Sequence, residues 1–260
     1  MKLIFIADIM GSPGRKAVKT LLPVLRDRYA PDVILANGEN SAGGNGITPK
    51  IANELYASGI HLITGGNHSW DNKDGVAHLD REPRLLRPHN YPDGNPGSGL
   101  GHVDLPGGSI LTVLNLQGRV FMPPLLCPFK TADLVLENHV GPVFIDFHGE
   151  ATSEKIAMAR YLDGRITALV GTHTHVQTSD ARILSGGTAF LTDAGMSGPH
   201  DGVIGMTEQS TLPRFIKQTP TRFVVAKGNV RLQGAFVEFD EESGLASKIE
   251  AFDEPLKEEV

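Results

Sequence analysis

The chain has 260 residues, of which 40% are hydrophobic and 21% charged, the composition of an ordinary globular protein. Its net charge of −6 argues against a protein that binds duplex DNA, because such binding needs lysine and arginine to replace counterions. The single cysteine, Cys127, excludes an intrachain disulfide and a cysteine-rich zinc site. The apolar runs are too short for a membrane helix or a signal peptide, so we expect a cytoplasmic protein without membrane attachment.

The first part of the chain alternates short apolar runs with segments of helical spacing. Strands are predicted at Leu3–Ala7, Val33–Ala36 and His61–Thr64. Helices are predicted over Arg15–Tyr29, with a kink or break at Pro23, and over Pro49–Ser58, with Thr48 as N-cap. The residues from Asp8 to Gly14 are expected to form a loop. Strands that alternate with helices indicate an α/β protein.

The rest of the chain combines further strands and helices with hairpin patterns. Strands are predicted at Val103–Leu105, Ile110–Leu116, Val143–Phe147, Ile166–Val170 and Phe236–Phe239. Helices are predicted at Thr131–Asn138 and Ser153–Leu162. Gly186-Gly187 and Lys227–Asn229 have the composition of hairpin turns, and Glu254–Val260 is expected to be a frayed acidic tail. These hairpins predict mixed rather than purely parallel sheets, within one domain covering residues 1–260.

Five of the predicted strands are followed by side chains that can bind metal ions. They are Asp8, Glu39 with Asn40, Asn67 with His68, His148, and His173 with His175. Because the carboxyl ends of strands in α/β sheets open onto a shared crevice, we expect these side chains to lie close together. Carboxylate, amide and imidazole ligands collected at one place predict a site for divalent metal ions.

Taken singly, each of these residues has a simpler explanation. Asp8 could cap the helix that follows it, and the histidines could be polar residues at strand ends. His173 and His175 are two residues apart, so in an extended segment both point to one side and could bind one metal or a pair. The remaining histidines are expected to be surface or structural residues: His61, His78, His89, His102, His139 and His200.

Other catalytic motifs are absent or weak. Gly11–Lys16 lacks the spacing of a Walker motif, and Gly195–Pro199 matches a nucleophile elbow only loosely. The glycine-rich loop Gly43–Gly46 could cradle a phosphate, but we expect it to let the backbone pass close to the site. Phe121 and Met122, with Arg119, could line a base pocket; we expect Phe121 and Met122 to be core residues.

The strand-end motifs resemble those of the calcineurin-like metallophosphoesterases. Gly66-Asn67-His68 and Gly171-Thr172-His173-Thr174-His175 match this superfamily well. Two positions differ, since Met10 replaces the histidine expected two residues after Asp8, and Glu39 replaces the bridging aspartate.

With these differences the chain is similar to the bacterial YmdB-like phosphodiesterases over nearly its whole length. The similarity rests on Gly38–Gly44, Gly66–His68, Asp146–Lys155, Gly171–Val176 and Thr192–Met196. It implies a four-layer αββα sandwich of two mixed sheets flanked by helices, a dinuclear metal centre and hydrolysis of cyclic nucleotides.

The same resemblance assigns roles to the strand-end residues. Glu39 bridges the two metals. The first metal is assigned Asp8, Asn40 and His175, and the second is assigned Asn67, His148 and His173. A hydroxide between the metals is expected to attack phosphorus while His68 protonates the leaving oxygen; alternatively, His68 orients a ligand. Iron is implied by resemblance alone, because this ligand set also suits Mn or Zn.

We therefore expect a dinuclear-metal phosphodiesterase acting on 2′,3′- or 3′,5′-cyclic nucleotides. One alternative is a phosphomonoesterase or nucleotidase with the same metals, and another is a regulatory metal- and nucleotide-binding protein with incidental turnover. A full ligand set together with a candidate acid favours catalysis, because a binding protein needs no proton donor at a leaving group. The expected partner is a small phosphodiester, and the chain could form a homo-oligomer.

Overall fold

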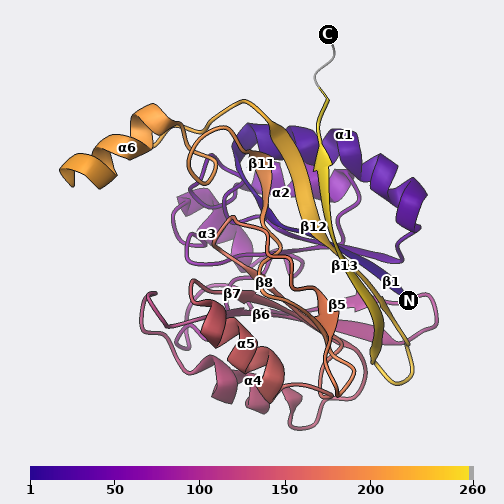
Figure 1. The fold of residues 1–260 in the computed structure, drawn as a ribbon. Coiled ribbons are helices and arrows are strands. Elements are labelled where there is room, and N and C mark those ends of the chain that lie inside the picture. Colours follow the sequence, from indigo (N-terminus) through magenta and orange to yellow (C-terminus); the bar gives the residue numbers. More distant parts are fainter. Residues whose placement is uncertain (258–260) are drawn as a thin grey trace.

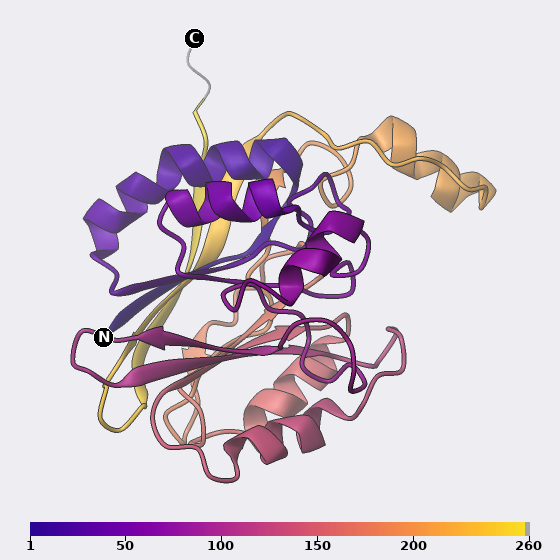
Figure 2. The same ribbon diagram turned by 180° about the vertical axis from the view of Figure 1, so that it is seen from behind.

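Two β-sheets lie face to face and carry helices on their outer sides (Figure 1, Figure 2). The computed structural model describes residues 1–257. Both sheets contain parallel and antiparallel pairs, so the prediction of a four-layer αββα sandwich with mixed sheets is confirmed. Within residues 1–257, no helix has the length and apolar character that crossing a bilayer requires.

The first sheet is built around the N-terminal strand. Its strands are β1 (Lys2–Ile6), β2 (Asp8–Ile9), β3 (Val33–Asn37), β4 (Leu62–Thr64), β11 (Met196–Pro199), β12 (Val230–Phe239) and β13 (Ala246–Pro255). They follow the order β2-β11-β12-β1-β3-β4, with β13 paired to β12. The pairs β1–β3 and β3–β4 are parallel, so the polar residues after β3 and β4 lie at one end of the sheet.

The second sheet has a parallel centre and antiparallel edges. Its strands are β5 (Leu100–Asp104), β6 (Ile110–Gln117), β7 (Val143–His148), β8 (Ala168–Thr172), β9 (Arg182–Ile183) and β10 (Ala189–Leu191). They follow the order β5-β6-β7-β8-β10-β9. The predicted hairpins at β5–β6 and at Gly186-Gly187 are both present.

Alternating side chains of β1 show how the layers are held together. Leu3 and Phe5 point between the sheets, where the ring centroids of Phe5 and Phe144 are 5.0 Å apart. Ile4 and Ile6 point outward, beneath α1 (Gly11–Tyr29) and α2 (Pro49–Ala57). On the opposite side, α4 (Pro128–Leu136) and α5 (Thr152–Tyr161) cover the second sheet. Because side chains alternate along each strand, one set packs between the two sheets and the other packs against the helices.

Two predictions near the N-terminus are wrong. Helix α1 begins at Gly11 rather than at Arg15, and Pro23 lies inside it, so the helix does not break there. Because Pro23 lies on the exposed face, the carbonyl group that loses its amide partner can bind water. Asp8 lies in β2 rather than in a loop, and the N-cap of α1 is Met10, so Asp8 does not cap the helix.

Other differences lie where proline and glycine obscure the sequence pattern. The sequence did not predict α3 (Lys73–Leu79) or α6 (Glu208–Lys217), which contains Pro213, and α4 begins at Pro128 rather than Thr131. Lys227–Asn229 precedes β12 and ends the segment 200–229, which carries α6 away from the body of the molecule (Figure 1). Glu254 belongs to β13 rather than to a frayed tail, and residues 258–260 of the predicted tail lie outside the described residues.

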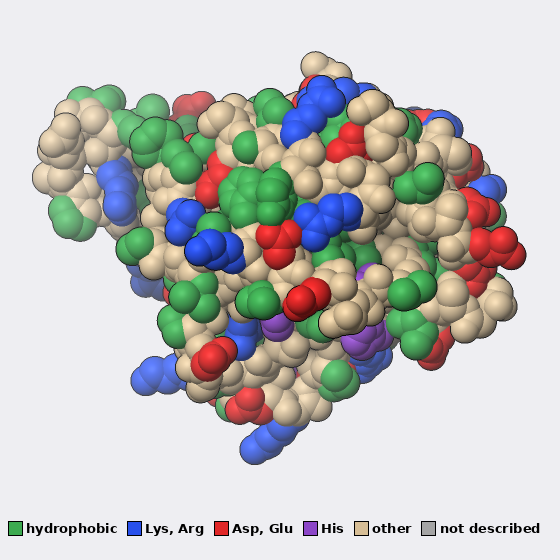
Figure 3. Space-filling model, turned by 90° about the horizontal axis from the view of Figure 1, so that it is seen from below, with side chains coloured by type: hydrophobic (Ala, Val, Ile, Leu, Met, Phe, Trp, Pro, Cys, Tyr) green, Lys and Arg blue, Asp and Glu red, His purple; other side chains and the backbone are tan. Residues whose placement is uncertain are grey.

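The projecting helix α6 leaves much of its apolar surface uncovered. Leu212, Phe215 and Ile216 are all exposed. Figure 3 shows hydrophobic side chains on the part of the molecule that projects from the main body. These residues therefore add little to the three apolar clusters that hold the layers together.

Candidate metal centre

Direct contacts join all seven predicted metal ligands into one network. The members are Asp8, Glu39, Asn40, Asn67, His148, His173 and His175. They come from the ends of five predicted strands in both sheets, so the expectation that these side chains lie close together is confirmed. Six of these seven residues lie at or beyond the carboxyl ends of β3, β4, β7 and β8, and Asp8 begins the short strand β2 directly after β1.

One half of the network is centred on His148, whose side chain is fully buried. Its Nε2 atom lies 2.9 Å from Glu39 Oε1, 3.0 Å from Asn67 Oδ1 and 3.1 Å from His173 Nδ1. Ligand atoms of Glu39, His148 and His173 all lie within 4.8 Å of one another. This half therefore gathers one carboxylate, one amide oxygen and two imidazoles.

The other half is centred on Asp8, which is also fully buried. Asn40 donates a hydrogen bond of 2.8 Å from Nδ2 to Asp8 Oδ1, and His175 Nε2 lies 3.4 Å from Asp8 Oδ2. Asn40 Nδ2 also lies 3.4 Å from Glu39 Oε1. Glu39 thus contacts both halves, which is the position that a bridging carboxylate requires.

The donor set of this network fits metal ions. The Nε2 atom of His148 faces three polar atoms, yet a single N–H can make a good hydrogen bond to only one of them. Within residues 1–257, the buried Asp8 Oδ2 makes no well-formed hydrogen bond, and the nearby His175 Nε2 lies 3.4 Å away. Gly66 passes so close that a Cβ atom there would overlap both Glu39 and His148. These three features fit a cation-binding centre: crowded lone pairs, a carboxylate oxygen without a well-formed hydrogen bond, and a backbone that approaches closely.

The His173–His175 segment does not have the extended geometry that the sequence suggested. His173 has φ = 100° and His175 has φ = 62°, so both lie in the left-handed region that non-glycine residues rarely adopt. The two side chains consequently reach different partners, with His173 against His148 and His175 against Asp8. Strain of this kind persists only where the surroundings impose it.

A buried ion pair beneath this segment holds it in place. Lys155 Nζ lies 2.6 Å from Asp193 Oδ2, and both side chains are almost inaccessible to solvent. Thr174, which lies between the two histidines, donates to the same oxygen from its Oγ1 (2.8 Å) and its backbone N–H (3.2 Å). Sequence reasoning missed Lys155 and Asp193, because a lysine inside a helical pattern is usually solvated.

Sequence reasoning also missed a second supporting group, the carboxylate of Asp146, which lies two residues before His148. Thr172 Oγ1 donates to Asp146 Oδ1 at 2.6 Å and lies 2.9 Å from His148 Nδ1. Thr64 and Asn37 donate to the other carboxylate oxygen of Asp146. Asp146 therefore orients His148 through Thr172, as outer carboxylates commonly do for metal-binding histidines. The spacing of Asp146 and His148 could have revealed this support, because residues two apart in a strand lie on one face.

Burial and neighbouring charges shift the pKa values in the network. Burial, together with the nearby His148, lowers the pKa of His173 to about 3. Burial also disfavours the charged form of His175, but the adjacent Asp8 outweighs it and raises the pKa of His175 to about 9. For Asp8, burial favours the neutral form, but the same pairing outweighs burial and holds the pKa of Asp8 well below its usual range. Burial raises the pKa of Asp146 to about 6.

His68 lies beside the network and is partly exposed to solvent. Its backbone N–H donates to Glu39 Oε2 at 2.9 Å, while its Nδ1 lies 2.7 Å from Asp71 Oδ2. About a third of its side chain is exposed. Asp71 thus fixes the ring from one side and leaves Nε2 as the ring nitrogen available to a substrate.

Phe121 contradicts the sequence-based expectation. We expected it in the core, but it is 88% exposed. It follows β6, and Arg119 and Val120 beside it make their backbone hydrogen bonds to Glu154 rather than within a sheet. The apolar character of a short run therefore did not decide burial in this loop.

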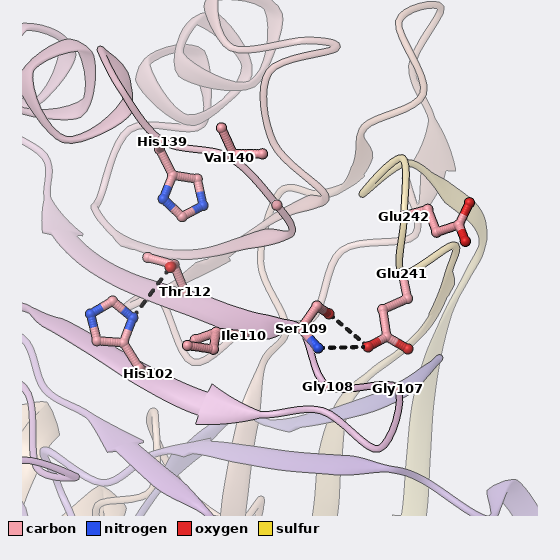
Figure 4. A pocket seen from close by; sticks show the side chains of 11 residues that line it. His102, Gly107, Gly108, Ser109, Ile110, Thr112, His139, Val140, Glu241 and Glu242 are labelled. Atoms are coloured by element: carbon pink, nitrogen blue, oxygen red, sulfur yellow. Dashed lines mark hydrogen bonds between the residues drawn. The ribbon is translucent and has the colours of Figure 1, made fainter.

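A separate cavity of about 750 Å³ contains none of the predicted ligands (Figure 4). It lies between the turn at Gly107-Gly108, the turn at Glu241 and the segment at His139–Gly141. Ser109 donates to Glu241 at one end, and His102 contacts Thr112 at the other. His102 and His139 therefore lie apart from the metal-binding network.

A four-layer sandwich with metal-binding side chains at its strand ends is typical of metallophosphoesterases. A family model described as YmdB-like protein matches residues 4–252. The chain is 49% identical over 253 residues, 96% of each chain, to the 2′,3′-cyclic-nucleotide 2′-phosphodiesterase of Bacillus subtilis (strain 168). The chain therefore belongs to the family of YmdB-like proteins.

Two solved structures share the whole fold. A hypothetical protein from Thermus thermophilus superposes with a TM-score of 0.93 at 41% identity, covering 98% of this chain and 99% of that one. A novel phosphatase from Mycoplasma pneumoniae also gives a TM-score of 0.93, at 34% identity, with 98% and 93% covered. The resemblance stated from the motifs is thus confirmed.

Proposed function

We propose that this hydrolase of phosphoester bonds cleaves nucleoside 2′,3′-cyclic phosphates at a centre of two metal ions. The observation that carries the proposal is the single, largely buried network that joins all seven predicted ligands through Glu39. The name of the Bacillus subtilis relative supports this substrate class. Nucleoside 3′,5′-cyclic phosphates are a second group of substrates to test.

The two halves of the network supply the two ligand sets. One metal would be held by Asp8, Asn40 and His175, and the other by Asn67, His148 and His173, with Glu39 between them. When bound, such ions supply Lewis-acid stabilisation of the phosphoryl oxygens and activation of water. The family resemblance favours iron, and manganese and zinc also suit these ligands.

His68 is the proposed proton donor. Water adds to phosphorus and releases a proton to solvent, the bond between phosphorus and the leaving ribose oxygen breaks, and that oxygen takes a proton from His68 Nε2. The contact between Nδ1 and Asp71 orients the ring for this transfer. Partial exposure fits the role, because a donor must reach substrate and be reprotonated from solvent.

Hydrolysis of 2′,3′-cyclic AMP by metal-replete protein tests the function. The wild type is expected to turn over, and His68→Ala is expected to lose about 10²–10⁴-fold in kcat, the usual contribution of a general acid. His102→Ala is the matched control, because His102 lies in the separate cavity and is expected to leave the rate unchanged. Equal rates for wild type and His68→Ala would show that His68 is not the acid.

A phosphomonoesterase is the second candidate, favoured by the description of the Mycoplasma pneumoniae structure as a phosphatase. The same preparation is therefore tested on 3′-AMP and p-nitrophenyl phosphate. Hydrolysis of these monoesters without hydrolysis of any cyclic diester would replace the phosphodiesterase proposal. Metal binding without turnover of either class would instead favour a regulatory binding protein.

A further inference from the structure

Phe121 combines two features that are unfavourable for an ordinary loop residue. Its aromatic side chain is 88% exposed, and its backbone has φ = 62°. Solvent-exposed aromatic surface and left-handed backbone at a non-glycine residue both cost free energy. A phenylalanine held in this way is therefore a candidate for a role outside the core.

The loop that carries Phe121 is fixed from beneath. Glu154, which is buried at the start of α5, accepts hydrogen bonds of 3.0 Å from the backbone N–H groups of Arg119 and Val120. Gly118 approaches this carboxylate so closely that a Cβ atom there would lie 2.6 Å from Glu154 Oε2. The exposed ring is consequently presented by a braced backbone and needs little ordering when it binds a ligand.

This loop borders the metal-binding network. The backbone N–H of Gly118 donates to the carbonyl oxygen of His148 at 2.9 Å, and Glu150, two residues after His148, contacts His173 Nε2 at 3.3 Å. Phe121 follows Gly118 by three residues, a reach of at most about 11 Å. The ribbon views show the loop after β6 projecting from the side of the molecule on which β6, β7 and β8 end (Figure 1, Figure 2).

We propose that Phe121 is a stacking platform for the nucleobase of the substrate, an inference that rests on the proposed function. In a nucleoside cyclic phosphate the ribose joins the base to the phosphate, and Phe121 follows by three residues Gly118, which donates a hydrogen bond to His148 of the network. An exposed phenyl ring offers a π-face but no hydrogen-bond donor or acceptor. Recognition through Phe121 alone is therefore expected to tolerate all bases and to favour purines, which have the larger stacking surface.

The test compares substrates with and without a base. For 2′,3′-cyclic AMP, Phe121→Ala is expected to raise KM about 5- to 150-fold, the loss of one base–aromatic stack, with kcat little changed. Phe121→Tyr retains the ring and is expected to behave as wild type. For glycerol 1,2-cyclic phosphate, which has the cyclic diester but no base, wild type and Phe121→Ala are expected to have equal kcat/KM.

Phe215→Ala is the matched control, because Phe215 is 71% exposed on α6. Folding of each variant is checked by circular dichroism. An unchanged KM for 2′,3′-cyclic AMP in Phe121→Ala would overturn the inference, and so would an equal loss on both substrates, which would indicate a general effect on the site.

A binding measurement separates this inference from the proposed function. Should the wild type hydrolyse neither diester, the proposed function fails, and calorimetric titration with 2′,3′-cyclic AMP then decides the role of Phe121. An affinity that falls about 5- to 150-fold in Phe121→Ala supports the platform. Equal affinity of the two proteins, or no binding by either, overturns it.

Discussion

At the scale of single residues, His148 is constrained by contacts to both nitrogens of its ring. Glu39, Asn67 and His173 surround its Nε2, and Thr172 holds its Nδ1. Thr172 and Asp146 therefore fix the orientation of the ring, and with it the direction in which Nε2 would face a metal. The motifs identified His148 but not this support, because a threonine in an apolar strand carries no separate signal in the sequence.

Replacing Thr172 tests this support directly. Thr172→Val keeps the shape of the side chain but removes the hydroxyl between Asp146 and His148. We expect metal affinity to fall about 10- to 100-fold, the usual cost of losing an outer-shell partner. Titration of stripped protein with metal measures the change, and Thr112→Val, a buried threonine against His102, is the control. Equal affinity for wild type and Thr172→Val would contradict this role.

The Asp8–His175 pair predicts how pH affects the protein stripped of metal. The pKa of His175 is about 9 in the folded protein and about 6.5 in an unfolded chain, so the folded state holds its proton more tightly. At any pH where Asp8 is ionised in both states, the pair therefore stabilises the fold fully below about pH 6.5, and this stabilisation is lost as pH rises through 9. The loss is about 3 kcal/mol, since each tenfold difference in proton affinity is worth about 1.4 kcal/mol.

Urea unfolding of chelator-treated protein between pH 6 and 9.5 measures this loss. Subtracting the curve of His175→Gln isolates the contribution of His175 from those of other titrating groups. Parallel curves for the two proteins over this range would contradict the predicted pairing.

At the scale of elements, α5 supports the turn after β8 through a buried charge. Lys155 extends from α5 to Asp193, and Asp193 in turn accepts from Thr174 between the two histidines. The helix and the strand were both predicted from spacing and apolar runs. The ion pair that joins them was not, because pairing between residues 38 positions apart leaves no local pattern.

Breaking this pair is expected to be costly. Lys155→Met leaves Asp193 buried without its cation, which should lower the free energy of unfolding by about 3–5 kcal/mol. Lys248→Met is the control, because its contact with Glu250 is exposed and exposed ion pairs contribute little to stability. Urea unfolding of both variants gives the comparison. Similar losses for the two lysines would contradict the structural role of Lys155.

At the scale of the whole molecule, the sequence predicts which side chains lie close together better than it predicts the helices around them. The residue types at five strand ends led to all seven members of the network, because parallel strands bring their carboxyl ends together. Two helices were not predicted, because α6 contains Pro213 and α3 is only seven residues long. The exposure of Phe121 was not predicted either, because apolar character does not by itself determine burial in a surface loop.

We propose that one network holds two metal ions and that both are needed for hydrolysis of a cyclic phosphodiester. The most direct measurement is the rate of 2′,3′-cyclic AMP hydrolysis as metal is added back, in measured equivalents, to stripped protein. The two-metal proposal predicts no turnover without metal and a rate that reaches its plateau at two equivalents per chain. Full activity in the stripped protein, or a plateau at one equivalent, would contradict it.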